Sequence, residues 1–265
     1  MTVPEFVKAF WHASTGLGRR AERVWWGVVA SDERYPLVWD ANHAAVLEPA
    51  PGLTTEELEA SLLPMLRDAG APHEHVEFWE ASVESPALAA CRRRGDHSDP
   101  DVIMVLRERP SGSAEPRAVR VDEVTRPQPS FWPWYRDSLR EFGMQLSEDV
   151  LDQLVRRTQE VFLPAGLRWF VGSIDGEPAG YASLLSLAGT GYLDNVVTMP
   201  AYRRRGVASA AVLSAVRASL DADDAEVFLL AESGGDPQRL YEGLGFTVAA
   251  SIESFTRALP AEEAS

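Results

Sequence analysis

One short segment constrains the fold more than any other part of the chain. In residues 197–208 an apolar, strand-like stretch turns into a helix through three consecutive arginines and a glycine. Gly206 and Ala208 keep side-chain bulk away from the turn, so backbone N–H groups can close around an anion. The start of a helix adds unpaired donors and the positive end of its dipole, and arginines add charge-assisted hydrogen bonds to phosphate. The segment predicts a phosphate-binding turn; a solvated arginine-rich turn is the alternative.

The hydrophobic periodicity around this turn predicts an α/β (α+β) fold. Beyond residue 117 the order is strand, two helices, three strands, helix, strand, helix, strand. The expected strands are 118–124, 167–174, 178–187, 191–198, 225–231 and 251–257, and the expected helices begin at 130, 147, 206 and 237. We therefore expect a mixed, mostly antiparallel sheet flanked by helices.

A second motif follows at residues 239–246, Arg-Leu-Tyr-Glu-Gly-Leu-Gly-Phe. Alone, Tyr241 in this motif reads as an aromatic packing residue on a short helix. Together and in this order, the two motifs resemble those of the GNAT acetyltransferase superfamily. Arg203, Gly206 and Ala208 match its Arg/Gln-x-x-Gly-x-Gly/Ala signature, and residues 240–246 resemble its Leu-Tyr-x-x-x-Gly-Phe ending.

The resemblance implies an N-acetyltransferase that moves an acetyl group from acetyl-CoA to an amine of a small molecule or peptide. In that family the arginine-rich turn holds the pyrophosphate of acetyl-CoA. The strand before it ends in a bulge whose backbone binds the pantetheine and the thioester carbonyl. The residues expected to contact acetyl-CoA are therefore Val196, Val197, Thr198, Arg203, Arg204, Arg205, Gly206, Val207, Ala208 and Ser209. No metal cofactor is expected.

The resemblance also implies the catalytic residues. Tyr241 matches the tyrosine that protonates the departing CoA thiolate. Many members place a glutamate eleven residues before the first arginine of the turn, and Tyr192 stands at that position here. Asp194, two residues on and on the same strand face, is the expected base, with a structural hydrogen bond as the alternative. Glu232 is the second candidate for the base.

The acceptor side of the site is expected to be aromatic. Trp132 and Tyr135 fall on the first helix of this half, and with Tyr192 they are the candidate substrate-binding residues; core packing is the alternative. The family's pantetheine-binding asparagine, seven residues before the tyrosine, is replaced by Gly234. This departure, with the missing glutamate, keeps open a non-catalytic acyl-CoA-binding or protein-interaction module with the same fold.

The N-terminal half shows a fainter version of the same order. A Pro/Ser/Gly-rich stretch at 109–116 predicts a boundary between domains 1–112 and 113–265. Strands are expected at 25–30, 37–47, 75–80 and 102–107, and helices at 54–69 and 86–94. Laying Gly95 over Gly245 places Cys91 on Tyr241, which indicates an internal duplication. Residues 48–53 contain no arginine, so we expect a degenerate GNAT-like half without CoA binding.

Composition narrows the remaining possibilities. A net charge of −15 argues against nucleic-acid binding, and no apolar run reaches the roughly 20 residues of a membrane helix. One cysteine and the absence of a signal-like N-terminus favour a cytoplasmic protein, and a homodimer is left open. His73 and His75 stand two residues apart without an evident third ligand, so no metal site is expected there. Residues 39–43, Trp-Asp-Ala-Asn-His, read either as a strand irregularity or as a ligand contact.

Overall fold

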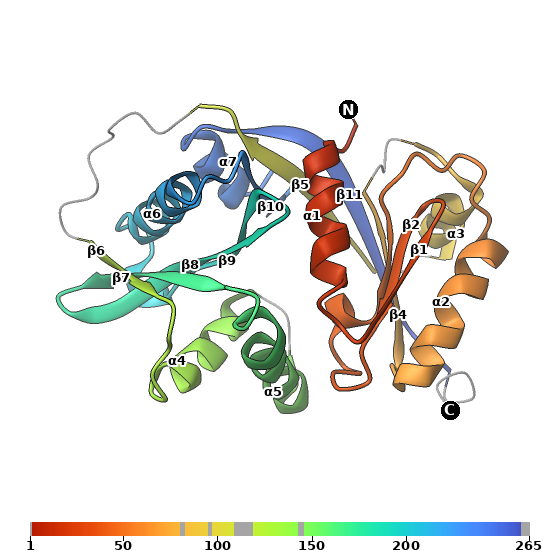
Figure 1. The fold of residues 1–265 in the computed structure, drawn as a ribbon, viewed down its shortest axis with the longest axis horizontal. Coiled ribbons are helices and arrows are strands. Elements are labelled where there is room, and N and C mark those ends of the chain that lie inside the picture. Colours follow the sequence, from red (N-terminus) through yellow and green to blue (C-terminus); the bar gives the residue numbers. More distant parts are fainter. Residues whose placement is uncertain (1, 80–82, 95–96, 109–118, 143–145, 261–265) are drawn as a thin grey trace. The chain divides into compact units, whose positions relative to one another are not determined.

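The computed structural model describes residues 2–79, 83–94, 97–108, 119–142 and 146–260 (Figure 1). The expected domain boundary at 112/113 lies outside these residues. Contacts between Cα atoms divide the chain into two compact units. The first comprises residues 1–103, 231–235 and 248–265, and the second comprises residues 104–230 and 236–247. Two segments of the stretch expected to form the second domain therefore belong to the first unit.

The first unit is built on strands that begin with a hairpin. Its elements are α1 (Glu5–Thr15), β1 (Arg20–Val24), β2 (Gly27–Ser31), the 3-10 turn η1 (Trp39–Ala41), β3 (His43–Val46), α2 (Thr55–Ala69), β4 (His73–Phe78), α3 (Pro86–Arg94) and β5 (His97–Leu106), which continues into the second unit. β1 and β2 are antiparallel, as are β2 and β3, whereas β3 and β4 are parallel. Residues 253–258 of β11 (Phe246–Ala258) then pair antiparallel with β4.

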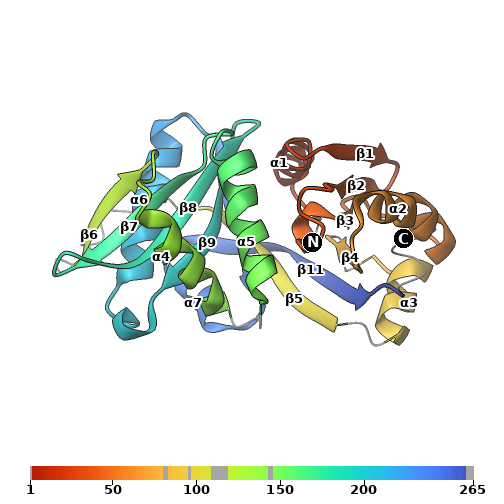
Figure 2. The ribbon, with the colours of Figure 1, turned by 90° about the horizontal axis from the view of Figure 1, so that it is seen from below.

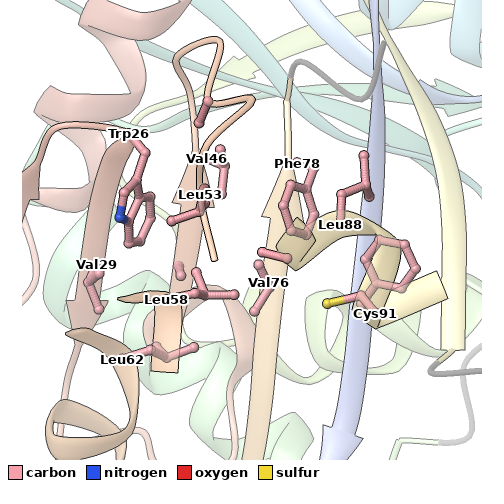
Figure 3. Close-up of a cluster of buried hydrophobic side chains, with 14 of the residues drawn as sticks. Trp26, Val29, Val46, Leu53, Leu58, Leu62, Val76, Phe78, Leu88 and Cys91 are labelled. Carbon is pink, nitrogen blue, oxygen red and sulfur yellow. The ribbon is translucent and has the colours of Figure 1, made fainter. Parts of the chain in front are cut away.

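The core of the first unit lies between the strands and two helices. Leu58, Leu62 and Leu66 recur at helical spacing along α2 and are fully buried. They pack in one cluster with Val76 and Phe78 from β4, part of which Figure 3 shows. Each fully buried leucine stabilises the fold by roughly 1.5–3 kcal/mol relative to an exposed one.

The second unit carries a five-stranded run of the sheet in the order β10-β9-β8-β7-β6. Its elements are β6 (Arg120–Val124), α4 (Phe131–Ser138), η2 (Leu139–Phe142), α5 (Glu148–Arg157), the π-helical turn η3 (Thr158–Phe162), β7 (Arg168–Ile174), β8 (Glu177–Leu187), β9 (Thr190–Thr198), η4 (Pro200–Tyr202), α6 (Val207–Asp221), β10 (Glu226–Glu232) and α7 (Asp236–Glu242). Helix α6 lies on one side of the strands, and α4 and α5 lie on the other (Figures 1 and 2). The expected mixed sheet flanked by helices is thus confirmed.

The two halves of the chain repeat one element order. β1-β2-β3-α2-β4-α3-β5 in the first half corresponds to β7-β8-β9-α6-β10-α7-β11 in the second. The pairing repeats as well, because β7, β8 and β9 are antiparallel neighbours and β9 and β10 are parallel. Cys91 on α3 and Tyr241 on α7 hold corresponding, buried places. This repeat agrees with the internal duplication inferred from the sequence.

The expected elements and the observed ones differ at a few places. Helix α1 was not predicted, although Val7 and Phe10 recur at helical spacing and are fully buried. The strand expected at 37–47 is shorter, because η1 occupies its first part and the Asn42 side chain bonds two backbone carbonyls there. No helix within the described ranges is long and apolar enough to cross a membrane.

Candidate functional site

Strand β9 contains a bulge close to the expected cofactor loop. Its pairing with β8 shifts between two residues: Ser183 lies opposite Asp194, and Ala182 lies opposite Val196. Asn195 is therefore the extra residue of a β-bulge, which bends the strand. The parallel pairing of β9 with β10 runs from Thr190 to Leu193 and stops before the bulge. Backbone groups at the end of β9 are thus placed to pair with an extended ligand, as an added strand would.

The chain then turns into α6 through a backbone suited to binding an anion. Arg203 is extended, whereas Arg204 has a φ of 59° and Gly206 a φ of 83°. Alternation of ordinary and left-handed residues turns successive N–H groups toward one point. No side chain caps Gly206, the residue before α6, so the first helical N–H groups remain for another acceptor. The backbone of this turn is therefore of a kind that can bind an anion.

The arginines of this turn are exposed. The Arg203 guanidinium is 55% exposed and donates to Glu141 of η2 at 2.7 Å. Its Nε also reaches the backbone oxygen of Thr198 at 3.4 Å. The Arg205 guanidinium lies over the Tyr202 ring, 5.6 Å from its centroid. An exposed ion pair such as Arg203–Glu141 contributes about 0–1 kcal/mol, so a phosphate group can replace Glu141 at low cost.

The corresponding helix start in the first unit has different chemistry. Thr54 caps α2 by accepting from the Glu57 backbone N–H at 3.2 Å, and the Glu57 carboxylate accepts from the Thr54 N–H at 3.2 Å. Glu56 adds a second negative charge to the first turn. These side chains satisfy the donors and repel an anion. The two corresponding helix starts therefore differ in their capacity to bind an anion.

Tyr241 lies near the end of α7 and is buried, with 6% of its surface exposed. Its ring packs against Phe246, with the centroids 6.2 Å apart. Burial raises the pKa of the Tyr241 hydroxyl above its ordinary value, so the group keeps its proton at neutral pH.

Asp194 lies on the same strand face as Tyr192, as expected. The Tyr192 hydroxyl is 3.5 Å from the Asp194 carboxylate, and the Asn195 amide donates to that carboxylate at 2.6 Å. Burial raises the pKa of Tyr135 and of Tyr181, and the charge of Asp194 raises both further. The carboxylate therefore lies near the aromatic residues of α4 and β8.

The candidate substrate-binding aromatics occupy different environments. Tyr135 is 3% exposed, its hydroxyl lies 3.2 Å from that of Thr158, and its ring contacts that of Trp169. This environment favours the packing alternative for Tyr135. Trp132 is only half-buried at the edge of the same cluster. Tyr192 is also half-buried and stacks on Phe228, with the centroids 4.8 Å apart.

Sequence reasoning did not identify Asn195 or Glu141. An Asp-Asn pair inside an apolar strand is a signal that could have indicated the bulge. Glu141 has no such signal, because it stands 62 residues before its partner Arg203. One group of side chains in the described residues has spacing suited to a metal ion, namely Asp40, His75 and Glu77. It belongs to the first unit.

Comparison with known proteins places this geometry in a family. The model of the acetyltransferase (GNAT) family matches residues 128–246, which include the bulge, the arginine-rich turn and Tyr241. No curated protein matches the sequence.

Solved structures of low sequence identity share the fold. A functionally unknown conserved protein from Staphylococcus epidermidis ATCC 12228 is similar over 92% of this chain and 95% of its own, with 12% identity and a TM-score of 0.72. A GCN5-related N-acetyltransferase from Kribbella flavida covers 98% of this chain and 97% of its own, with 17% identity and a TM-score of 0.63. A tandem GNAT protein from the clavulanic acid biosynthesis pathway covers 77% of this chain and 70% of its own, with 17% identity and a TM-score of 0.55. Residues 128–246 of this chain are therefore a domain of the GNAT acetyltransferase family.

Proposed function

We propose that the protein is an N-acetyltransferase that transfers an acetyl group from acetyl-CoA to an amine of a small molecule or peptide. The observation that carries this proposal is the uncapped start of α6, which directly follows a turn with two left-handed residues and three exposed arginines. Such a turn binds phosphate, and the bulged strand before it supplies backbone groups for the pantetheine. Val196–Thr198 and Arg203–Ser209 are the proposed cofactor contacts.

The proposed reaction is direct attack of an unprotonated amine on the thioester carbonyl. Backbone N–H groups at Val196 and Val197 stabilise the oxyanion that develops. Asp194 takes the amine proton directly or through water, and its position on the face of Tyr192 supports this role. The C–S bond breaks, and Tyr241 donates its proton to the departing thiolate. Tyr241 is protonated at neutral pH, as an ordinary tyrosine is, and burial keeps it so.

The proposed acceptor is an amine-bearing molecule near the half-buried faces of Tyr192 and Trp132. The net charge of −15 favours the approach of a cationic acceptor. The family's shared scaffold carries many acceptor pockets, so the acceptor must be found by screening amines.

Calorimetric titration with acetyl-CoA tests the cofactor part of this proposal. We expect one site per chain and roughly 10- to 100-fold weaker binding for Arg203→Ala, because a charge-assisted hydrogen bond contributes ~1.5–3 kcal/mol. Arg120→Ala is the matched control, since Arg120 is exposed on β6 and pairs with Asp122. An equal loss of acetyl-CoA affinity in the two variants would mean that only the net charge of the protein matters. It would exclude a specific contact between Arg203 and the cofactor.

Measuring turnover on screened amines distinguishes an enzyme from a non-catalytic binding module. Tyr241→Phe keeps the ring and removes the proton donor, so we expect turnover to fall by about 10²-fold or more with the acetyl-CoA Kd unchanged. Full activity of this variant would remove Tyr241 from the mechanism. Acetyl-CoA binding without turnover on any screened amine would favour a non-catalytic acyl-CoA-binding module.

A further inference from the structure

Strand β4 of the first unit carries buried polar side chains on the face turned away from its core. Val76 and Phe78 point into the hydrophobic cluster, and alternation places His73, His75 and Glu77 on the opposite face. All three are buried, with at most 9% of each residue exposed. Buried ionisable groups are costly unless they are paired or bind a metal ion. The partners of these three side chains therefore indicate what the face is built to hold.

His75 and Glu77 are each oriented by a second partner. His75 Nδ1 lies 2.7 Å from the Thr256 hydroxyl, which leaves Nε2 facing Glu77. The other carboxylate oxygen of Glu77 accepts from Trp79 Nε1 at 2.9 Å. The facing atoms, His75 Nε2 and Glu77 Oε1, are 3.6 Å apart, which is long for a hydrogen bond. Two ligands about 2.1 Å from one tetrahedral ion lie roughly 3.4 Å apart, so the spacing suits two metal ligands.

A third ligand comes from η1. One carboxylate oxygen of Asp40 and the ligand atoms of His75 and Glu77 all lie within 4.8 Å of one another. Trp39, the residue before Asp40, stacks on the His75 ring with the centroids 5.8 Å apart. Asn42 is fully buried and donates to two backbone carbonyls of the preceding loop at 2.8 and 3.1 Å. The loop that carries Asp40 is thus fixed in place beside the imidazole.

Two more histidines of the first unit, His73 and His43, lie near this group. His73 is 6% exposed, and its Nε2 is buried without a hydrogen-bond partner among the described residues. The His43 ring is 6.4 Å from that of His75. The His73 ring lies against that of Trp39, the residue before Asp40, with the centroids 6.4 Å apart.

The charge of the group also favours a cation. Glu77 and Asp40 bring two carboxyl groups together here, and Asp40 is exposed. A mixed set of imidazole and carboxylate ligands suits transition metals better than Mg²⁺, which prefers oxygen ligands and retains water.

We propose that Asp40, His75 and Glu77 of the first unit bind a divalent transition-metal ion such as Zn²⁺. The ion ties η1 to β4, and Thr256 and Trp79 orient its ligands from behind. This site is separate from the acetyl-CoA proposal, because its residues all belong to the unit without the arginine-rich turn. It gives the degenerate half a binding function of its own.

Titration of the untagged, metal-free full chain with Zn²⁺ tests the proposal. We expect binding at one site per chain and a melting temperature that rises by ~5–10 °C at a free Zn²⁺ concentration 100 times Kd. Glu77→Gln and His75→Ala should each weaken binding at least 10-fold. Thr256→Val removes only the bond to His75 Nδ1 and should weaken binding about 10-fold. Mg²⁺ should not compete.

The matched control is His12→Ala, which removes a partly buried histidine of α1 outside the group. Its Zn²⁺ affinity should equal that of the unmodified protein. Equal affinity of the unmodified protein and of folded Glu77→Gln and His75→Ala would mean adventitious zinc only and would overturn the proposal. Failure of the unmodified protein to bind Zn²⁺ up to millimolar concentration would overturn it as well. Neither outcome depends on acetyltransferase activity.

Discussion

Gly180→Ala tests whether the close packing of β8 against β9 fixes the backbone position of β9, the strand proposed to bind acetyl-CoA. Gly180 lies opposite Thr198 in the β8–β9 pair. A Cβ atom at this position would lie 2.3 Å from the Val197 backbone oxygen and 3.0 Å from Thr198 Cα. The shortest ordinary contact is 3.4 Å, so this part of β9 must move by about 1.1 Å. The atoms that must move belong to the backbone proposed to bind pantetheine.

This displacement has a cost in stability and a cost in binding. Overpacking of this kind costs ~1–3 kcal/mol, which lowers the melting temperature of a domain this size by about 2–10 °C. Loss of one backbone hydrogen bond to the pantetheine costs ~1 kcal/mol or more, so acetyl-CoA should bind at least about 5-fold more weakly. Calorimetric titration and thermal unfolding of the same preparation measure the two effects separately.

Gly172→Ala is the matched control, because Gly172 pairs with Gly180 across β7 and β8. Its added Cβ would lie within 3.4 Å only of side-chain ends, Val207 Cγ1 at 3.0 Å and Val119 Cγ1 at 3.3 Å. We expect a smaller loss of stability and unchanged acetyl-CoA affinity. If Gly180→Ala binds acetyl-CoA as tightly as Gly172→Ala, the reasoning that connects this contact to the cofactor strand is refuted.

Two further predictions concern stability. Burial raises the pKa of Tyr135 and Tyr181 above the ordinary value of 10.0, so the folded state holds these protons more tightly than the unfolded state. The stability that they contribute is complete below pH 10 and is lost as pH rises through the folded pKa values; at pH 11 the loss is ~1.4 kcal/mol per tyrosine. Urea unfolding between pH 9 and 11 should show a smaller loss for Tyr135→Phe, and an identical loss would contradict the assignment. Thr54→Ala removes the α2 cap and should cost ~1 kcal/mol in urea unfolding at pH 7, whereas an unchanged midpoint would mean that the capping box adds nothing.

The parts of the site that sequence could predict are those set by neighbouring residues. Gly206 occupies the left-handed conformation that only glycine adopts readily, and α6 begins one residue later. Thr54 and Glu57 form a capping box at the start of α2, a motif that depends only on their spacing of three residues. Asp194 shares a face with Tyr192 because side chains alternate along any strand. In each case the geometry follows from local backbone preferences and periodicity.

The sequence by itself determined the family resemblance, the repeated element order and the arginine-rich turn, since each depends on residue types at fixed short spacing. Only the tertiary structure decided that Glu141 pairs with Arg203, that β11 pairs with β4, and that Asp40 lies close to His75 and Glu77. These contacts join residues separated by tens to hundreds of positions. They depend on how the strands pair and how the helices pack. A hydrophobic pattern predicts which face of an element is buried, but it does not predict which distant side chain lies against that face.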